Sequence, residues 1–152
     1  MQDTANGPRI LRAEGHLAML ACGEALAGSL SGAELILLQG DLGMGKTTLC
    51  QGILKGLGYQ GRVRSPTYTL VEPYDVSLGP LYHFDFYRIG DPQELDFIGL
   101  DEMLATPAVK LVEWPEMAGD RLPPADICLK IRLDPELGEA ARQIEVQRAQ
   151  HG

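Results

Sequence analysis

The amino-acid sequence predicts an α/β fold, in which helices flank a mixed central β-sheet and the chain ends in a β-hairpin. The first observation is a strand-length apolar run at residues 34–39, followed directly by a glycine-rich stretch and then by apolar residues at helical spacing. The second is a set of further strand-length apolar runs downstream. The third is a pair of segments near the carboxyl terminus that alternate apolar and polar residues across a turn.

Length and composition indicate one ordinary globular domain over residues 1–152. A chain of 152 residues can bury a real core, and 45% hydrophobic with 22% charged residues is typical of a globular protein. The apolar runs are too short to cross a bilayer and the amino terminus lacks a signal-peptide pattern, so we expect a cytoplasmic protein without membrane association. Cys22, Cys50 and Cys128 are widely spread and are expected to be free thiols. The net charge of −8 disfavours direct binding to a nucleic-acid backbone.

The first half of the chain is predicted to hold two helices and three strands. In chain order the segments are a frayed stretch at 1–12, a helix at 16–30, a strand at 34–39, a helix at 48–57, and strand-like runs at 67–75 and 81–88 that form a hairpin. Ser31 and Gly32 end the first helix before the strand begins.

The second half is predicted to hold two short helices and three strands. Asp91 is a helix N-cap, with Pro92 at the first position and Glu94 at the third. The segments are a helix from there to about residue 98, a helix from 100–104, a buried strand at 109–114 that Pro115 stops, and a terminal hairpin of 127–133 with 142–148.

Residues 40–47 (GDLGMGKT) match the G-x-x-x-x-G-K-[ST] pattern of a phosphate-binding P-loop. The strand before it and the helix after it predict a single-domain P-loop NTPase, because successive N–H groups and the helix N-terminus would then face the phosphates. Lys46 can reach the β- and γ-phosphates, and the Thr47 hydroxyl can bind Mg²⁺. The residues of this stretch predicted to bind the nucleotide are Asp41, Leu42, Gly43, Met44, Gly45, Lys46, Thr47 and Thr48.

Hydrolysis also needs an acid that holds Mg²⁺ from a second side, and such acids stand at the carboxyl ends of neighbouring strands. Asp85 and Glu113 each end an apolar strand, so the predicted metal ligands are these two acids and Thr47. Thr67 lies where small GTPases place a switch threonine that senses the γ-phosphate, unless it is a plain strand-entry threonine. The predicted catalytic residues are therefore Lys46, Thr67, Asp85 and Glu113.

Other residues bear on the choice of nucleotide and of function. No N-K-x-D stretch is present to read guanine, so we expect ATP rather than GTP. His83 is interpreted as a core or strand-face histidine rather than a base. Trp114, the only tryptophan, either packs in the apolar core or faces the nucleotide or a partner as a switch residue. Arg121 is the one basic residue within 111–129, which gives little support to an arginine-bearing lid of the kind that small-molecule kinases use.

Several segments together resemble the TsaE family, also called YjeE, the bacterial P-loop ATPases of the threonylcarbamoyladenosine tRNA-modification pathway. The segments are GDLGMGKTTL (40–49), VRSPTYTLVEPY (63–74), YHFDFYR (82–88), DPQELDFIGL (91–100) and LVEWPE (111–116). They occur in order over roughly residues 16–146. The resemblance implies a mixed-sheet P-loop fold that binds ATP and Mg²⁺ and hydrolyses ATP slowly by itself.

The resemblance also implies partners and further site residues. The partners would be TsaD and TsaB, whose complex transfers a threonylcarbamoyl group to an adenosine of tRNA, so that this chain meets tRNA only indirectly. Asp85 would hold a Walker B-like position and Thr67 a switch-like one. The helix at His16 would approach the nucleotide, and a basic residue is expected near the turn of the terminal hairpin, where Arg142 is the nearest arginine.

Two other functions remain open from the residues alone. A small-molecule P-loop kinase would yield a phosphorylated metabolite, and a non-catalytic nucleotide-sensing module would bind ATP and a partner without releasing phosphate.

Overall fold

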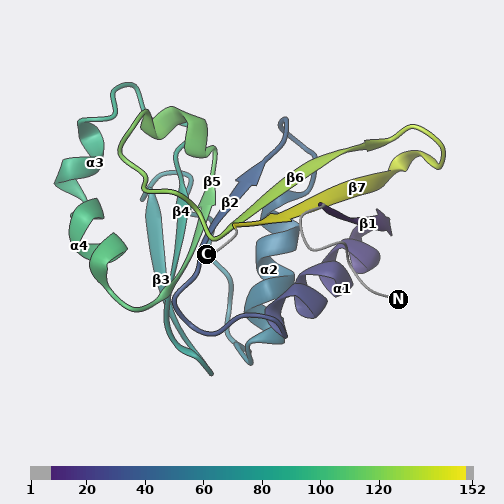
Figure 1. Cartoon of the computed structure of the whole chain (residues 1–152), viewed down its shortest axis with the longest axis horizontal. Helices are drawn as coiled ribbons and strands as arrows, with labels where there is room; N and C mark the ends of the chain where they lie inside the picture. Colours follow the sequence, from purple (N-terminus) through teal and green to yellow (C-terminus); the bar gives the residue numbers. More distant parts are fainter. Residues whose placement is uncertain (1–7, 150–152) are drawn as a thin grey trace.

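The computed structural model describes residues 8–149, which form a seven-stranded mixed sheet with helices packed against it (Figure 1). The strand order across the sheet is β1-β7-β6-β2-β5-β4-β3. The strands are β1 (Arg9–Glu14), β2 (Leu35–Gln39), β3 (Val71–Val76), β4 (Gly79–Asp85), β5 (Val109–Glu113), β6 (Ile127–Asp134) and β7 (Gly138–Arg148). Strand β2 is parallel to β5 and β6, and β4 is parallel to β5, whereas the β1–β7, β6–β7 and β3–β4 pairs are antiparallel. The predicted α/β fold and terminal hairpin are confirmed.

Two apolar cores lie on opposite faces of this sheet. Ile36 and Leu38 of β2 belong to the core under the long helices, whereas Leu35 and Leu37 contact the core that includes the short helices. A strand buried on both faces reads as a continuous apolar run, as residues 35–38 do.

The helices are α1 (His16–Ala27), α2 (Lys46–Gly56), α3 (Glu94–Phe97), α4 (Leu100–Ala105) and the 3₁₀ turn η1 (Pro115–Ala118). No helix within residues 8–149 is long and apolar enough to cross a membrane.

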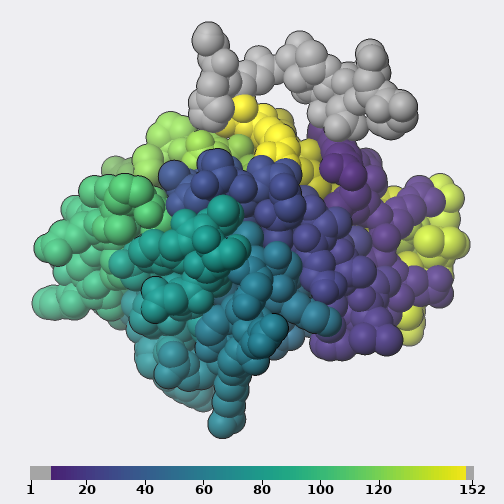
Figure 2. All heavy atoms as spheres, turned by 90° about the horizontal axis from the view of Figure 1, so that it is seen from below, coloured from purple at the N-terminus to yellow at the C-terminus, as the bar shows by residue number. Residues whose placement is uncertain are grey.

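The amino-terminal segment differs from the prediction. Residues 9–12, expected to be frayed, belong to β1, which pairs with β7 from Arg9↔Val146 to Glu14↔Ala141. Figure 2 shows the purple amino-terminal segment against the yellow-green end of the terminal hairpin. Residues 1–7 of the predicted frayed stretch lie outside the described residues. The two ends of the chain are therefore joined through the sheet.

Some element boundaries also differ. Helix α1 ends at Ala27 rather than at residue 30, and α2 begins two residues early, at Lys46. The predicted strand at 67–75 begins only at Val71, because residues 67–70 form a turn in which the Leu70 N–H donates to the Pro66 carbonyl at 2.8 Å. The terminal hairpin is longer than predicted, since β7 begins at Gly138.

The predicted N-cap at Asp91 is wrong by two residues, because α3 spans only Glu94–Phe97 and Gln93 is its N-cap. Asp91 lies in the turn before the helix, where its Oδ1 accepts the Gln93 N–H at 2.9 Å and Glu94 Oε2 accepts the Asp91 N–H at 2.9 Å. The expected Asp91 and Glu94 side chains therefore do bind backbone N–H groups, in the turn that leads into α3.

Helices α1 and α2 approach each other through glycines. A Cβ atom at Gly52 would lie 2.3 Å from the Leu20 carbonyl oxygen, and one at Gly23 would lie 2.5 Å from the Leu49 carbonyl oxygen. Both obstacles are backbone atoms, so a side chain at either position requires the helices to move apart. The glycine inside α2 therefore serves packing, and it holds α1 against the helix that follows the P-loop.

Gly52→Ala is expected to lower the free energy of unfolding by about 1–3 kcal/mol, because overpacking outweighs the ~1 kcal/mol that alanine gains over glycine in a helix. Urea denaturation measures the change. Gly28→Ala is the matched control: Gly28 has φ −65° and its nearest obstacle, the Ala25 carbonyl oxygen, is 3.5 Å away. Equal stability of the Gly52 variant and the parent chain would show that the two helices separate freely.

Candidate functional site

The P-loop connects the carboxyl end of β2 to the N-terminus of α2. Gly43 and Gly45 have φ of 79° and 106°, the left-handed region that residues with a Cβ rarely adopt. Gly45 is the N-cap of α2, and a Cβ on it would lie 3.1 Å from Cε of Met19. The first N–H groups of α2 have no partner within the helix, so this end of the helix suits an anion.

Lys46 is buried at the first position of α2. Its ammonium group donates a short hydrogen bond to the Gly40 carbonyl and lies 3.5 Å from the centroid of the Trp114 ring. Burial lowers the pKa of Lys46, and the nearby Glu113 carboxylate opposes that effect. The amine is thus held inside the loop, within the reach of a phosphate bound there.

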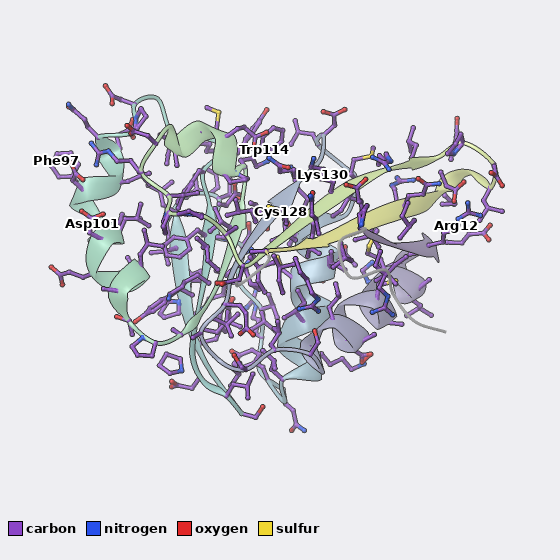
Figure 3. The ribbon with its side chains drawn as sticks, in the orientation of Figure 1. Arg12, Phe97, Asp101, Trp114, Cys128 and Lys130 are labelled. Carbon is purple, nitrogen blue, oxygen red and sulfur yellow. The ribbon has the colours of Figure 1, made fainter. Side chains whose placement is uncertain are left out.

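Trp114 follows Glu113 directly and has the left-handed backbone conformation, with φ 56°. A non-glycine residue in that region is uncommon and stores strain. Its ring contacts Tyr87 at 4.8 Å between centroids, packs against the second core and also lines a cavity (below). The packing interpretation of Trp114 is therefore confirmed, and its role as a switch residue stays a prediction. Figure 3 labels Trp114 at the end of β5.

Asp85 and Glu113 lie side by side, because they pair in register at the carboxyl ends of the parallel strands β4 and β5. The Thr47 hydroxyl donates to the Glu113 carboxylate, 3.1 Å from each oxygen. Burial raises the pKa of Asp85 and the neighbouring Glu113 adds to this rise, although the Tyr87 N–H that Asp85 accepts opposes it. Two buried carboxylates and a hydroxyl are hard oxygen donors that favour a cation between them, and they fit Mg²⁺.

Two adjacent cavities meet at the P-loop. The larger, of about 470 Å³, is lined by Leu42, Gly43, Gly45, Lys46, Thr47, Thr48, Thr67, Asp85, Tyr87, Arg88, Glu113 and Trp114. The smaller, of about 260 Å³, is lined by Gly15, His16, Met19, Gly43, Met44, Gly45, Thr48, Ala140 and Arg142. Gly43, Gly45 and Thr48 belong to both, so the two cavities form neighbouring compartments on either side of the loop.

The structure brings nearly all the predicted site residues to these cavities. The exception is Asp41, which lines neither and instead accepts the Met44 N–H through its carbonyl oxygen at 3.2 Å. Arg142, from β7, donates to the Met44 carbonyl at 3.3 Å, so the expected basic residue of the hairpin does reach the P-loop. Arg121 forms an ion pair with Asp96 and lines neither cavity, which argues against a kinase lid at this position.

Sequence reasoning missed several lining residues. Tyr87 and Arg88 lie two and three residues after Asp85 and line the larger cavity, and Arg88 also stacks on Tyr68, 4.7 Å from its ring centroid. Met19 lies one helical turn after His16, so helical spacing could have found it. Nothing local predicts Ala140 in the smaller cavity, because it reaches the P-loop only through the pairing of β7.

Comparisons with known proteins agree with this geometry. The family model described as "Threonylcarbamoyl adenosine biosynthesis protein TsaE" matches residues 14–144. A Haemophilus influenzae protein named tRNA threonylcarbamoyladenosine biosynthesis protein TsaE is 47% identical over 114 residues, 75% of this chain and 70% of that protein. An Aquifex aeolicus protein of the same name is 40% identical over 127 residues, 82% of this chain and 85% of that one. The crystal structure of Bacillus subtilis YdiB superposes with a TM-score of 0.77 at 28% identity, covering 97% of this chain and 90% of the other.

Proposed function

Because the chain belongs to the TsaE family, we propose that it binds and hydrolyses ATP with Mg²⁺ and thereby supports turnover of a TsaB–TsaD complex in tRNA threonylcarbamoyladenosine biosynthesis. The observation that carries this proposal is the meeting of Lys46, Thr47 and two strand-end acids in one cavity beside the P-loop. The relatives named above are biosynthesis proteins of that modification, which supports the pathway.

The larger cavity is proposed to take the phosphates. The P-loop N–H groups bind the α- and β-phosphate oxygens, and Lys46 leaves the Gly40 carbonyl to contact the β- and γ-phosphates. Thr67 lines the same cavity, with its hydroxyl 2.7 Å from that of Ser65, where it can sense the γ-phosphate. Nucleotide binding would thus replace a hydrogen bond within the loop by charge-assisted bonds to the ligand.

Thr47 and Glu113 would hold Mg²⁺, with Asp85 beside them. When bound there, the ion would neutralise negative charge on the β- and γ-phosphate oxygens. The two carboxylates could also accept hydrogen bonds from a water molecule beside the γ-phosphate, and their burial would keep these contacts in a low-dielectric environment.

The smaller cavity is proposed to take the base and ribose, between His16 of α1 and Arg142 of β7. The choice of adenine over guanine rests on the sequence, which has no N-K-x-D reader.

Arg142→Ala is expected to weaken ATP binding roughly tenfold, in line with the loss of a hydrogen bond from a charged group. Titration with a labelled ATP analogue measures the affinity. Arg12→Ala is the matched control, because Arg12 lies next to the same hairpin but pairs with Asp134 and Glu136 (Figure 3). If the Arg142 variant binds ATP as tightly as the parent chain does, the proposal that the base binds in this cavity is wrong.

Reconstitution tests the proposed function as a whole. TsaB, TsaD, tRNA and ATP are incubated with and without this chain, and modified tRNA per complex is counted. We expect repeated rounds of modification only with the chain present. A yield that does not depend on the chain would refute the proposal. A stoichiometric phosphorylated metabolite would support the kinase alternative, and normal assembly without any phosphate release would support the sensing module.

A further inference from the structure

His83 lies on β4, two residues before Asp85 and on the same face of the sheet. Its side chain is fully buried, as expected for a core histidine. An imidazole buried in a protein interior loses its hydrogen bonds to water, so each ring nitrogen needs a partner or carries a penalty.

The partner of His83 is an acid of the proposed metal site. His83 Nε2 lies 2.7 Å from Glu113 Oε2, and the Glu113 side chain is almost fully buried as well. An ionised carboxylate can only accept, so Nε2–H is the donor. The other ring nitrogen, Nδ1, has no hydrogen-bond partner within residues 8–149. Within the described residues, Glu113 is therefore the only hydrogen-bond partner of the His83 ring, whose position is otherwise set by the packing around it.

The Glu113 carboxylate is fixed by two donors from different elements. The Thr47 hydroxyl of α2, next to the P-loop, donates to both of its oxygens, and the His83 ring of the neighbouring strand β4 donates to Oε2. A carboxylate held by both donors cannot rotate about its last bond without breaking one of them. Oε2 accepts hydrogen bonds from both His83 and Thr47. Within residues 8–149, Oε1 accepts a hydrogen bond from the Thr47 hydroxyl alone.

From these contacts we infer that His83 is a positioning residue, which fixes Oε2 of Glu113 so that Oε1, which in the described part of the chain accepts a hydrogen bond from Thr47 alone, faces the proposed cation site beside Asp85. This inference rests on the proposed Mg·ATP site. Partners that hydrogen-bond a metal ligand typically change metal affinity by about 10–100-fold when they are removed. His83 lines neither of the two cavities, so its loss should raise the Mg²⁺ requirement and leave metal-free nucleotide binding in place.

The test compares two substitutions of similar size. His83→Met removes the donor, whereas His83→Gln keeps an N–H group that can reach Glu113. Labelled ATP is titrated first in EDTA and then against rising Mg²⁺, and hydrolysis is followed over the same Mg²⁺ range. We expect the Met variant to need about 10–100-fold more Mg²⁺ for half-maximal hydrolysis, the Gln variant to stay near the parent chain, and both to bind ATP in EDTA as the parent does.

Cys50→Ala is the matched control, because the Cys50 thiol is buried in the same cluster, within 4.8 Å of ligand atoms of His83 and Glu113, and donates no hydrogen bond to either. It should leave the Mg²⁺ requirement unchanged. An unshifted Met variant overturns the inference, as does a Met variant that loses ATP binding in EDTA, since His83 would then be needed for the fold. Equal shifts in all three variants also overturn it. If instead the parent chain hydrolyses ATP without Mg²⁺, the proposed metal site fails rather than the role of His83.

Discussion

Glu113→Gln and Asp85→Asn are each expected to lower ATP hydrolysis by ~10²–10³-fold, the usual effect of losing one oriented electrostatic contact. Each substitution keeps the side-chain volume and removes one negative charge from the pair of buried carboxylates. The P-loop and Lys46 remain, so ATP should still bind, more weakly for Glu113→Gln because a proposed Mg²⁺ ligand is lost. Phosphate release and nucleotide titration measure the two effects separately.

The control is Asp126→Asn, which changes a carboxylate near the opposite end of β2, where Asp126 accepts the Leu35 N–H at 2.8 Å. Its rate should equal that of the parent chain. In the reconstituted complex, the Glu113 and Asp85 variants should assemble yet support little modification beyond a first round. Parental hydrolysis in both variants would contradict the strand-end site. Lost hydrolysis with continued rounds of modification would contradict the coupling of ATP to the pathway.

Lys46→Ala is expected to weaken ATP binding by about 10² or more, because the phosphates lose their only direct ammonium partner in the cavity. The fold should persist, since the substitution removes a buried charge whose lowered pKa already reports an unfavourable environment for the ammonium form. Calorimetric titration measures binding, and thermal unfolding checks the fold.

Lys55→Ala serves as the control on the same helix, because Lys55 is exposed and its one ion pair within residues 8–149 is with Glu24 at 3.6 Å. It should bind ATP like the parent chain. Parental affinity in the Lys46 variant would contradict the assignment of the P-loop as the phosphate site.

The site could be predicted from the sequence where local chemistry determines it. The P-loop spacing, the strand before it and an acid at each of two strand ends are short-range signals, and Lys46, Thr47, Asp85 and Glu113 meet as expected. The turn at Asp91 and Glu94 is likewise a short-range signal, although the helix begins only at Glu94.

The remainder depends on contacts between residues far apart in the chain. Strand β1 was missed because residues 9–14 form a strand only through their pairing with 141–146. The bond between His83 and Glu113 joins neighbouring strands whose register no local pattern gives. Leu70, with φ 68°, ends a turn inside a run whose composition favours a strand, so tertiary context outweighed propensity there.

The wall of the smaller cavity comes from residues 15–19 near one end of the chain and 140–142 near the other. A nascent chain that has been synthesised only through β6 already carries the whole P-loop, Lys46 and both acids. It still lacks the strand that pairs with β1 and the arginine that reaches Met44. Such a chain would therefore lack one wall of the cavity that we propose for the base. If the base binds there as proposed, nucleotide should stabilise the chain more strongly once β7 has paired with β1 and Arg142 has reached Met44.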